Sequence, residues 1–238
     1  MRSTQASLVK KHDSPSGLVS QVVFQVEEIF PFLEGQFVMI EKEIQWKIIK
    51  RPYSIASTSQ EMMNQKHIAI VVKKASNQWM SNYLTQEITL GEEVLIKWPV
   101  GHYTISPDHQ NYLLISTGSW LSPNVGIFKH LVYGEWKYKK IVNVFWEKTK
   151  DDIVPEVYDY FTKHNQEWVH NFFHLSREEN VSEGFRKGYV QSSIAEALEI
   201  TWINTACFIC GKPEMVDEVK EILQNAWIEK WNITFEKY

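Results

Sequence analysis

The segment Arg51–Ser54, with the sequence Arg-Pro-Tyr-Ser, holds three side chains that together can bind a phosphorylated ring compound. An arginine can form a bidentate contact with a phosphate, and a tyrosine two residues later can present the face of its ring. The adjacent serine hydroxyl can hydrogen-bond a ring nitrogen. The four residues follow a basic stretch and open a strand-like run. A flavin dinucleotide has the phosphates and the flat ring that this combination fits.

A second candidate site follows the strand-like run Ala206–Cys210. Gly211 permits a close approach of the chain to a ligand, and Pro213 suits the first turn of a helix. The chain has only two cysteines, Cys207 and Cys210, which are too few for a disulfide framework, a zinc site or an iron-sulfur cluster. We therefore expect a reducing compartment, a core position for Cys207, no metal site and no redox disulfide, since a thioredoxin context is missing.

Charge and hydropathy exclude several classes of function. The formal net charge is -4 over 238 residues, and acidic and basic residues are interspersed, so nothing indicates a nucleic-acid partner or an anionic membrane. No stretch approaches 18 consecutive apolar residues, and the segment Met1–Gly17 lacks the apolar run of a signal peptide. We expect a cytoplasmic protein without membrane insertion.

The first hundred residues predict short strands separated by polar turns such as Asp13–Gly17 and Thr58–Gln65. This pattern favours an antiparallel barrel or sandwich. The strand-like runs are Leu18–Val26, Gln36–Ile40, Tyr53–Ala56, His67–Lys73 and Glu93–Pro99.

From about Asn111 the pattern changes to strands that alternate with helices, which predicts a parallel sheet wrapped by helices. The predicted strands are Tyr112–Ser116, Ile141–Trp146, Trp168–Leu175 and Ala206–Cys210, and the predicted helices are Asn124–Tyr133, Val154–Lys163, Ser192–Glu199 and Pro213–Ala226. Pro107 and Asp108 interrupt both patterns, so we place the domain boundary there, with domains 1–108 and 109–238.

Five elements in the first domain resemble the ferredoxin-NADP reductase family in order and spacing. The run from Arg51 resembles the family's R-x-Y-S flavin signature, Gly35–Val38 resembles its G-Q-F-V strand, and Gly91 and Pro99–Tyr103 resemble later elements. Ile70–Lys73 with Ser81–Leu84 resembles the strand and loop that cradle the FAD pyrophosphate, although Asn77 and Gln78 stand where glycines are common. The resemblance implies that FAD is bound by Arg51, Pro52, Tyr53, Ser54, Ile70, Val71, Val72, Met80 and Ser81.

In the second domain, Ile115–Pro123 reads I-S-T-G-S-W-L-S-P and resembles the family's T-G-T-G-I-A-P loop, which receives the dinucleotide pyrophosphate. Thr117, Gly118 and Ser119 keep the pattern and are the implied binding residues. Trp120 replaces the second glycine, where backbone must approach phosphate closely. Three interpretations stay open: Trp120 covers the groove, swings aside on binding, or marks a protein whose nicotinamide step is weak or lost.

Ser176 and Arg177 resemble the family's S-R-E segment, in which both residues receive the 2'-phosphate of NADP. An arginine suits that phosphate, so the resemblance implies NADP as cofactor, with NAD left open. Tyr189 stands where bacterial members carry a second arginine; it can stack on adenine, and Arg186 or Lys187 would help neutralise the phosphate.

Phe208–Val216 resembles the family's C-G-x-P-x-M-V motif, which implies that Cys210 meets the nicotinamide and that Gly211 contacts the cofactor. The terminal Phe235–Tyr238 resembles the family's E-x-Y end. This implies that Tyr238 stacks on the exposed flavin face, opposite Tyr53, and that a nearby carboxylate assists proton movement. The implied catalytic residues are Ser54, Cys210, Glu236 and Tyr238.

Over residues 18–238, the resemblance implies an N-terminal antiparallel Greek-key β-barrel for FAD and a C-terminal α/β domain for the nicotinamide cofactor. We expect a monomer that transfers electrons between NADPH and a one-electron carrier such as ferredoxin or flavodoxin. The surface near Trp79, Trp98 and His102 could dock that carrier or belong to the core. Two alternatives stay open: a reductase component feeding an oxygenase or haem partner, and a flavin-binding partner or sensor with impaired nicotinamide binding.

Overall fold

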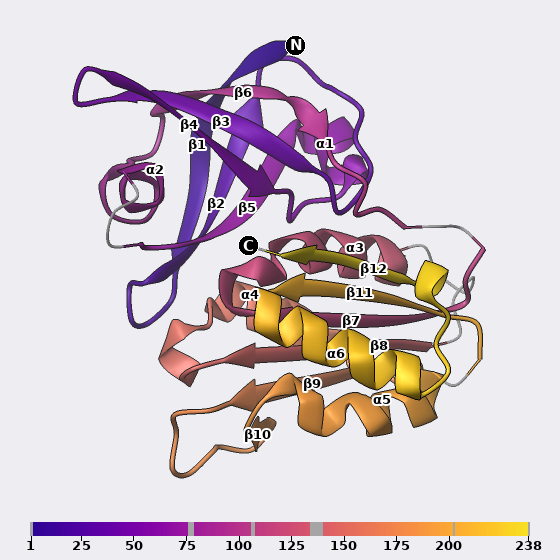
Figure 1. Cartoon of the computed structure of the whole chain (residues 1–238). Helices are drawn as coiled ribbons and strands as arrows, with labels where there is room; N and C mark the ends of the chain where they lie inside the picture. The colour runs from indigo at the N-terminus through magenta and orange to yellow at the C-terminus, as the bar shows by residue number, and fades with distance from the viewer. Residues whose placement is uncertain (1, 76–78, 106–107, 134–139, 202, 238) are drawn as a thin grey trace.

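The computed structural model describes residues 2–75, 79–105, 108–133, 140–201 and 203–237. They form two parts, each built on a six-stranded sheet (Figure 1). The first sheet is antiparallel and curled, and the second is parallel, so the predicted barrel followed by an α/β part is confirmed. Within these residues no helix has the length and apolar character needed to cross a membrane.

The first sheet has the strand order β4-β3-β6-β1-β2-β5, in which β6 lies between β1 and β3 as in a Greek key. The two edge strands, β4 and β5, approach each other where the N–H of Ala56, just after β4, donates to the carbonyl of Ala69 on β5 at 2.7 Å. The strands are β1 (Ser3–Asp13), β2 (Val19–Val26), β3 (Phe37–Ile44), β4 (Lys47–Ser54), β5 (His67–Lys73) and β6 (Glu93–Val100).

The structure corrects two expectations for this part. The predicted turn Thr58–Gln65 contains helix α1 (Ser59–Gln65), because Thr58 and Glu61 form a capping box that satisfies the first free N–H groups. Strand β1 was not predicted, and its apolar residues Ala6 and Leu8 are buried in the barrel core. The short helix α2 (Trp79–Asn82) and a π-helical turn (Tyr83–Glu87) lie between β5 and β6.

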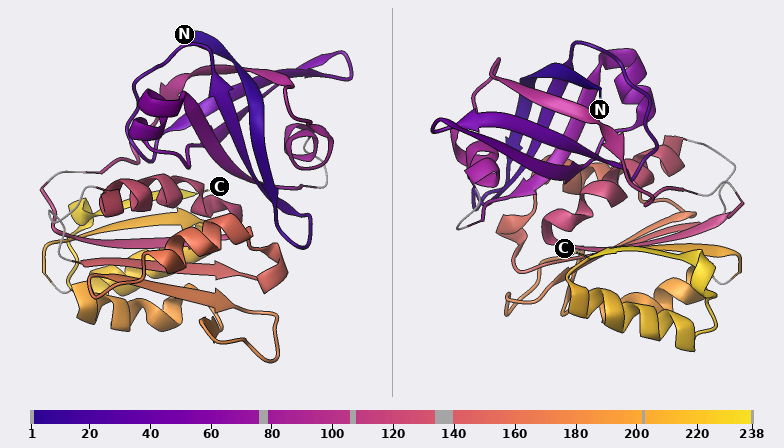
Figure 2. Two further views of the ribbon diagram at one scale, coloured as in Figure 1. Left: turned by 180° about the vertical axis from the view of Figure 1, so that it is seen from behind. Right: turned by 45° about the horizontal axis from the view of Figure 1, so that its top comes forward.

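The second sheet has the order β10-β9-β8-β7-β11-β12, with helices on both faces. Helices α3 and α4 cover one face of this sheet, α3 on the side of the barrel, and α5 and α6 cover the other face (Figure 2). The strands are β7 (Asn111–Thr117), β8 (Lys140–Glu147), β9 (Val169–Leu175), β10 (Phe185–Lys187), β11 (Thr205–Gly211) and β12 (Ile233–Lys237). The helices are α3 (Ser122–Tyr133), α4 (Pro155–Lys163), α5 (Ile194–Thr201) and α6 (Pro213–Asn225). The edge strands β10 and β12 were not predicted.

Helix α3 joins the two parts. The hydroxyl of Ser122 accepts a hydrogen bond from the N–H of Val71 at 3.0 Å and donates one to the carbonyl of Ser54 at 2.7 Å. A Cβ on Gly126 would lie 3.0 Å from the carbonyl oxygens of both Ile55 and Ser57, so a glycine allows the helix to approach this closely. The end of the Arg-Pro-Tyr-Ser strand is therefore fixed against the helix that follows the dinucleotide loop.

Candidate functional site

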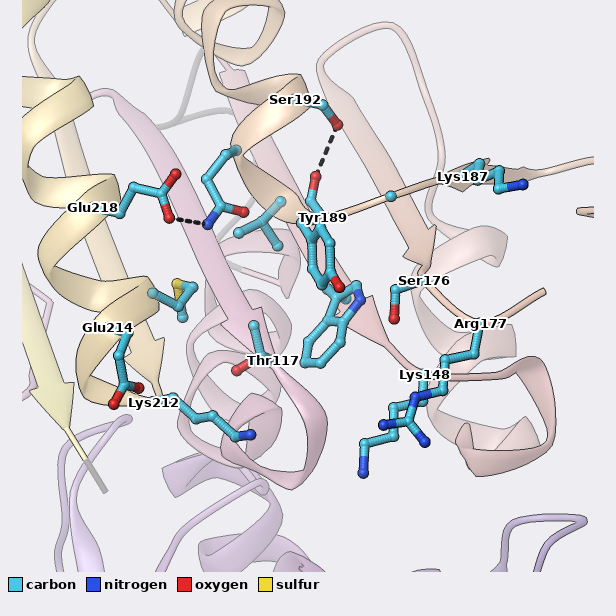
Figure 3. Close-up of a pocket in the computed structure, with 15 residues that line it drawn as sticks. Thr117, Lys148, Ser176, Arg177, Lys187, Tyr189, Ser192, Lys212, Glu214 and Glu218 are labelled. Carbon is cyan, nitrogen blue, oxygen red and sulfur yellow. Dashed lines mark hydrogen bonds between the residues drawn. The ribbon is translucent and has the colours of Figure 1, made fainter. Parts of the chain in front are cut away.

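A cavity of about 730 Å³ lies at the carboxyl end of the parallel sheet (Figure 3). In an open α/β sheet this is the edge at which ligands bind, because the loops that follow neighbouring strands converge there. Its lining residues are Thr117, Trp146, Lys148, Ser176, Arg177, Lys187, Gly188, Tyr189, Val190, Gln191, Ser192, Lys212, Glu214, Met215 and Glu218. Of the predicted dinucleotide residues, Thr117, Ser176 and Arg177 therefore share one cavity.

Four cationic side chains line this cavity, which suits a ligand with several phosphates. Figure 3 shows Lys148, Arg177 and Lys187 on the side of Ser176, and Lys212 on the side of α6. Glu214 and Glu218, from the first turns of α6, supply negative charge on that opposite side.

Sequence reasoning missed Lys148 and Lys212 as cavity residues. The signal was their position, since Lys148 directly follows β8 and Lys212 directly follows β11. The carboxyl ends of parallel strands meet at one edge, so any side chain directly after such a strand is a candidate. Without the strand order, nothing in the sequence says which strand ends are neighbours.

Three lining residues carry a buried polar side-chain atom with no hydrogen-bond partner among the described residues. They are Thr117 at Oγ1, Trp146 at Nε1 and Gln191 at Oε1, while the Gln191 amide nitrogen donates to Glu218 at 2.7 Å. Buried polar groups are normally paired, so these three atoms are open to hydrogen bonds from a polar ligand. The donor and acceptor set therefore fits a polar ligand such as a nicotinamide dinucleotide.

Beside this cavity, His174 and Arg186 meet at a buried serine. His174 Nε2 lies 2.9 Å from Ser193 Oγ, and burial, followed by the charge of Arg186, lowers the pKa of His174 to about 4. Arg186 donates to Ser193 at 2.9 Å and to Glu196 at 3.0 Å. Arg186 does not line the cavity, so of the two cations expected to support Arg177, only Lys187 does.

The predicted pyrophosphate loop forms the 3-10 helix Gly118–Leu121. Gly118 has a φ of 59° and carries the left-handed conformation that glycine allows. Gly118, Ser119 and Trp120 are half-buried and do not line the cavity described above. Trp120 packs against the apolar cluster that both parts of the protein share.

Cys210 and Glu236 lie side by side, since they are register partners on the neighbouring strands β11 and β12. The thiol of Cys210 is fully buried, and burial, followed by the charge of Glu236, raises its pKa well above the usual value. Cys210 is therefore a neutral thiol at pH 7. Cys207 packs against the other face of the sheet, so the two sulfurs cannot bond, and burial raises its pKa to about 12. Tyr238 lies outside the described residues.

Gly211 is required by packing. A Cβ at this position would lie 2.2 Å from Met215 Cε and 2.6 Å from Thr117 Oγ1. Glycine therefore allows the end of β11 to lie against both Thr117 and the first turn of α6. Met215 and Thr117 line the cavity, whereas Gly211 lies behind them.

The predicted flavin residues of the first part lie on β4 and at its end. Arg51 is exposed and donates to the carbonyl of Lys50 at 2.8 Å, and Pro52 is also exposed. Tyr53 is half-buried against the barrel core, and burial raises its pKa. The exposed guanidinium of Arg51 suits a phosphate of a flavin dinucleotide, and the half-buried ring of Tyr53 suits its flat ring system. The backbone of Ser54 is held in place by its hydrogen bond to α3.

The other predicted flavin residues have buried side chains. Ile70 and Val72 point into the barrel core, and Val71 points into the shared cluster, where its N–H is already bonded to Ser122. Met80 and Ser81 are buried in α2. Asn77 and Gln78 lie outside the described residues.

The three residues suggested for docking a carrier differ in exposure. Trp79 is exposed and has the ammonium of Lys47 at 4.9 Å from its ring centre, and His102 is exposed as well. Trp98 is half-buried, with its ring centre 6.0 Å from that of Phe30, so it belongs partly to the barrel core.

An ion-pair network that sequence reasoning did not detect crosses from the barrel to the sheet. Lys73 Nζ, at the end of β5, lies 3.1 Å from Glu147 Oε1 and 3.3 Å from Asp152 Oδ2. Glu147 ends β8, and its carboxylate also accepts the N–H of Lys148 at 3.0 Å. No group of three or more histidine, cysteine, aspartate or glutamate side chains in the described chain could hold a metal ion.

Two family models match this chain. The model described as oxidoreductase FAD-binding domain matches residues 6–105, and the model described as oxidoreductase NAD-binding domain matches residues 114–221. The chain thus carries an FAD-binding and a nicotinamide-dinucleotide-binding domain.

Curated relatives are distant but match most of the chain. The ferredoxin-NADP reductase of Pseudomonas aeruginosa is 27% identical over 210 residues, which are 82% of this chain and 79% of the relative. A glycine betaine monooxygenase reductase subunit of Chromohalobacter salexigens is 24% identical over 204 residues, which are 83% of this chain and 53% of the relative. The chain thus spans about half the length of such oxygenase reductase subunits.

Solved structures share the fold. A ferredoxin-NADP reductase from Neisseria gonorrhoeae with bound FAD and NADP has a TM-score of 0.80 at 16% identity, with 100% of this chain and 99% of that chain covered. An Amycolatopsis cytochrome P450 reductase has a TM-score of 0.85 at 20% identity, with 99% of this chain and 69% of that chain covered.

Proposed function

Because the chain belongs to the ferredoxin-NADP reductase family of flavoprotein oxidoreductases, we propose that it transfers electrons between NADPH and a one-electron carrier such as ferredoxin or flavodoxin. The observation that carries the choice of NADPH is the cavity at the carboxyl end of the parallel sheet. Arg177 and Lys187 lie there beside Ser176 and Tyr189. Two cations and a hydroxyl suit the additional 2'-phosphate, which carries about two negative charges, and NADH lacks that phosphate.

The first domain supplies the flavin site in this proposal. Bound FAD would accept a hydride from the nicotinamide and release its electrons singly. Arg51 binds a phosphate of the cofactor, Tyr53 stacks on the ring system, and Ser54 orients the ring through its hydroxyl. Pro52 keeps the strand extended between them, since proline fixes φ. The strand at Ile70 and Val72 and the helix at Met80 and Ser81 form the wall beside this site.

The second domain positions the nicotinamide. Thr117, Gly118 and Ser119 hold the pyrophosphate, and Gly211 lets the end of β11 lie close to it. The buried, neutral Cys210 excludes water and adds no charge where the hydride moves. Glu236, on the strand beside Cys210, would assist proton movement to the reduced ring system, and Tyr238 would be the second ring that stacks on the flavin.

A second candidate function differs only in the acceptor. A reductase subunit of glycine betaine monooxygenase and an electron transfer component of 2-halobenzoate 1,2-dioxygenase are among the relatives, which favours an oxygenase component as the alternative partner. The third candidate, a flavin-binding sensor without hydride transfer, rests on Trp120. The four cationic side chains of the cavity argue against a sensor without a dinucleotide, because gathered positive charge favours binding of an anionic ligand.

Anaerobic stopped-flow absorbance of the FAD-loaded protein separates these candidates. We expect rapid bleaching of the visible flavin band with NADPH and slower bleaching with NADH. Bleaching by neither, with a flavin that dithionite still reduces, would support the sensor. The reduced protein is then mixed with oxidised ferredoxin, flavodoxin or an oxygenase component, and the fastest reoxidation identifies the acceptor class.

The variant Arg177→Ala tests the 2'-phosphate assignment. A lost charge-assisted hydrogen bond is worth about 1.5–3 kcal/mol, so KM for NADPH should rise roughly tenfold to a hundredfold while KM for NADH stays unchanged. Lys163→Ala, on the exposed face of α4 and outside the cavity, is the matched control. Equal losses for NADPH and NADH would mean that Arg177 does not recognise the 2'-phosphate.

A further inference from the structure

Two aromatic rings face each other inside the cavity. Tyr189 and Trp146 have ring centres 5.4 Å apart and planes inclined by 38°. Tyr189 comes from the loop after β10, whereas Trp146 is the last residue but one of β8. Figure 3 shows Tyr189 near the middle of the cavity, with Ser176 and Arg177 on one side and Thr117 on the other.

Trp146 has a property that its packing does not explain. Its indole nitrogen is buried and has no hydrogen-bond partner in the described part of the chain. A buried N–H normally finds a partner, and an indole at a binding surface usually does so. The ring is only partly buried against the apolar cluster under α5 and α6, so its remaining surface is available to the cavity.

Tyr189 is exposed on the side away from its backbone anchor. Its side chain is 57% exposed, and its backbone carbonyl is held by the Ser192 hydroxyl at 2.8 Å. Gly188 precedes it with a φ of 115° and has open space where a Cβ would lie. Separating the two rings removes one aromatic contact, and a base that stacks between them supplies two.

We propose that Trp146 is the second wall of an adenine clamp, in which the purine enters between the rings of Tyr189 and Trp146. This inference rests on the proposed function, because it assumes that the adenosine 2'-phosphate end of the dinucleotide occupies this cavity. Two stacked contacts require ring planes roughly 7 Å apart, so Tyr189 must swing outward. That movement uncovers the Trp146 N–H, which then donates to an oxygen of the ligand.

The position of the clamp matches the charges around it. Lys187 and Tyr189 are separated by one residue, and Ser176 and Arg177 follow the strand that pairs with β8. A 2'-phosphate held by Arg177 and Lys187 therefore puts the attached base within reach of both rings. Binding on the outer face of Tyr189 alone would leave the Trp146 N–H without a partner.

The test uses adenosine 2',5'-bisphosphate as probe on the FAD-loaded protein, with calorimetry and tryptophan fluorescence. Base stacking on an aromatic ring contributes enough that Trp146→Leu should weaken binding about tenfold to a hundredfold. Trp146→Phe keeps a ring and should lose less than about fivefold. Inorganic pyrophosphate, which has no base, should bind equally to the wild type and to Trp146→Leu.

Trp227→Leu is the matched control, since Trp227 is 91% exposed in the turn after α6 and lies outside the cavity. The probe should change tryptophan fluorescence in the wild type and in Trp227→Leu, but not in Trp146→Phe. Unchanged affinity in Trp146→Leu would overturn the clamp while the wild type still binds the probe. Failure of the wild type to bind the probe would instead refute the proposed function. If Trp146→Leu does not fold, an identical fluorescence change in Trp146→Phe and the wild type would still overturn the clamp.

Discussion

Replacing Lys73 by methionine should destabilise the protein strongly, because Lys73 neutralises two carboxylates at the junction of the domains. The side chains of Glu147 and Asp152 are only 3% and 8% exposed, and Lys73 itself is 26% exposed. Removing one partner of a buried pair costs about 3–5 kcal/mol, since a charge remains without compensation. The partial exposure of Lys73 lets water compensate in part, so we expect the lower end, about 3 kcal/mol.

The assay is thermal unfolding followed by circular dichroism, with FAD at a fixed saturating concentration. For a chain of this length, 1 kcal/mol corresponds to about 2–4 °C, so Tm should fall by about 6–12 °C. Lys74→Met is the matched control, because Lys74 is exposed and its ammonium donates to the side-chain oxygen of Gln86 at 3.4 Å. It should change the free energy of unfolding by less than about 0.5 kcal/mol.

A charge-removing rescue completes the test. In Lys73→Met combined with Glu147→Gln and Asp152→Asn, no uncompensated charge remains, and a large part of the lost stability should return. KM for NADPH should also rise in Lys73→Met, because Glu147 lies next to Lys148 and close to Gly118. Equal Tm values for Lys73→Met and Lys74→Met, or a triple variant no better than the single one, would refute the reasoning.

Three further predictions concern packing and pH. Gly211→Ala puts a methyl group against Met215 Cε and Thr117 Oγ1. We therefore expect thermal unfolding to show a loss of about 1–3 kcal/mol in stability, and KM for NADPH to rise at least tenfold. A variant with unchanged stability and unchanged KM would contradict the packing argument. The pKa of His174 is about 4 in the folded protein, below its ordinary 6.5, so the unfolded chain binds more protons and stability falls as pH drops from about 6.5 to 4. Burial alone would raise the pKa of Glu34, but hydrogen bonds from His130 and Ser59 lower it to about 2. Ionised Glu34 therefore stabilises the folded protein above about pH 4.5, and this stabilisation is lost as the pH falls towards 2. The urea midpoint of unfolding, measured against pH, should no longer fall between about pH 6.5 and 4 because of this histidine in His174→Asn, and should fall less between about pH 4.5 and 2 in Glu34→Gln. A pH dependence equal to that of the wild type in both variants would refute both assignments.

The sequence predicted the larger elements because their patterns are strong. Strands β7 and β11 are buried at every residue and read as continuous apolar runs, as parallel strands covered on both faces do. Helices α3 and α6 were predicted to within about two residues. Periodicity predicted each domain by itself. The order of the motifs along the chain predicted that the barrel and the α/β domain belong to one two-domain protein.

The missed elements had weaker or unused signals. Strand β1 carries Lys10 and Lys11 and pairs between β2 and β6, so its stability comes from distant neighbours rather than from its own apolar content. Helix α1 has a capping box at Thr58 and Glu61 that could have been detected. The edge strand β10 has three residues, too few for any periodicity.

The candidate site was predicted unevenly for a related reason. Arg177, Ser176 and Thr117 are found from local motifs, whereas Lys148 and Trp146 line the same cavity only because β8 lies between β7 and β9. Strand order is a tertiary property, and a single sequence does not contain it in readable form. The roles assigned to these residues stay predictions until variants are measured.

Trp120 is best understood from the contacts that surround it. Hydride transfer needs two rings held roughly 3–3.5 Å apart, so the domains must be fixed against each other. Ser122 bonds the backbone of both Ser54 and Val71, and Gly126 lets α3 lie against the barrel. Trp120 precedes this contact by two residues and packs against the cluster that both domains share. Its indole therefore adds to the junction of the domains, where a glycine would contribute no packing, and this accounts for a bulky residue in the loop without requiring that the dinucleotide site be lost.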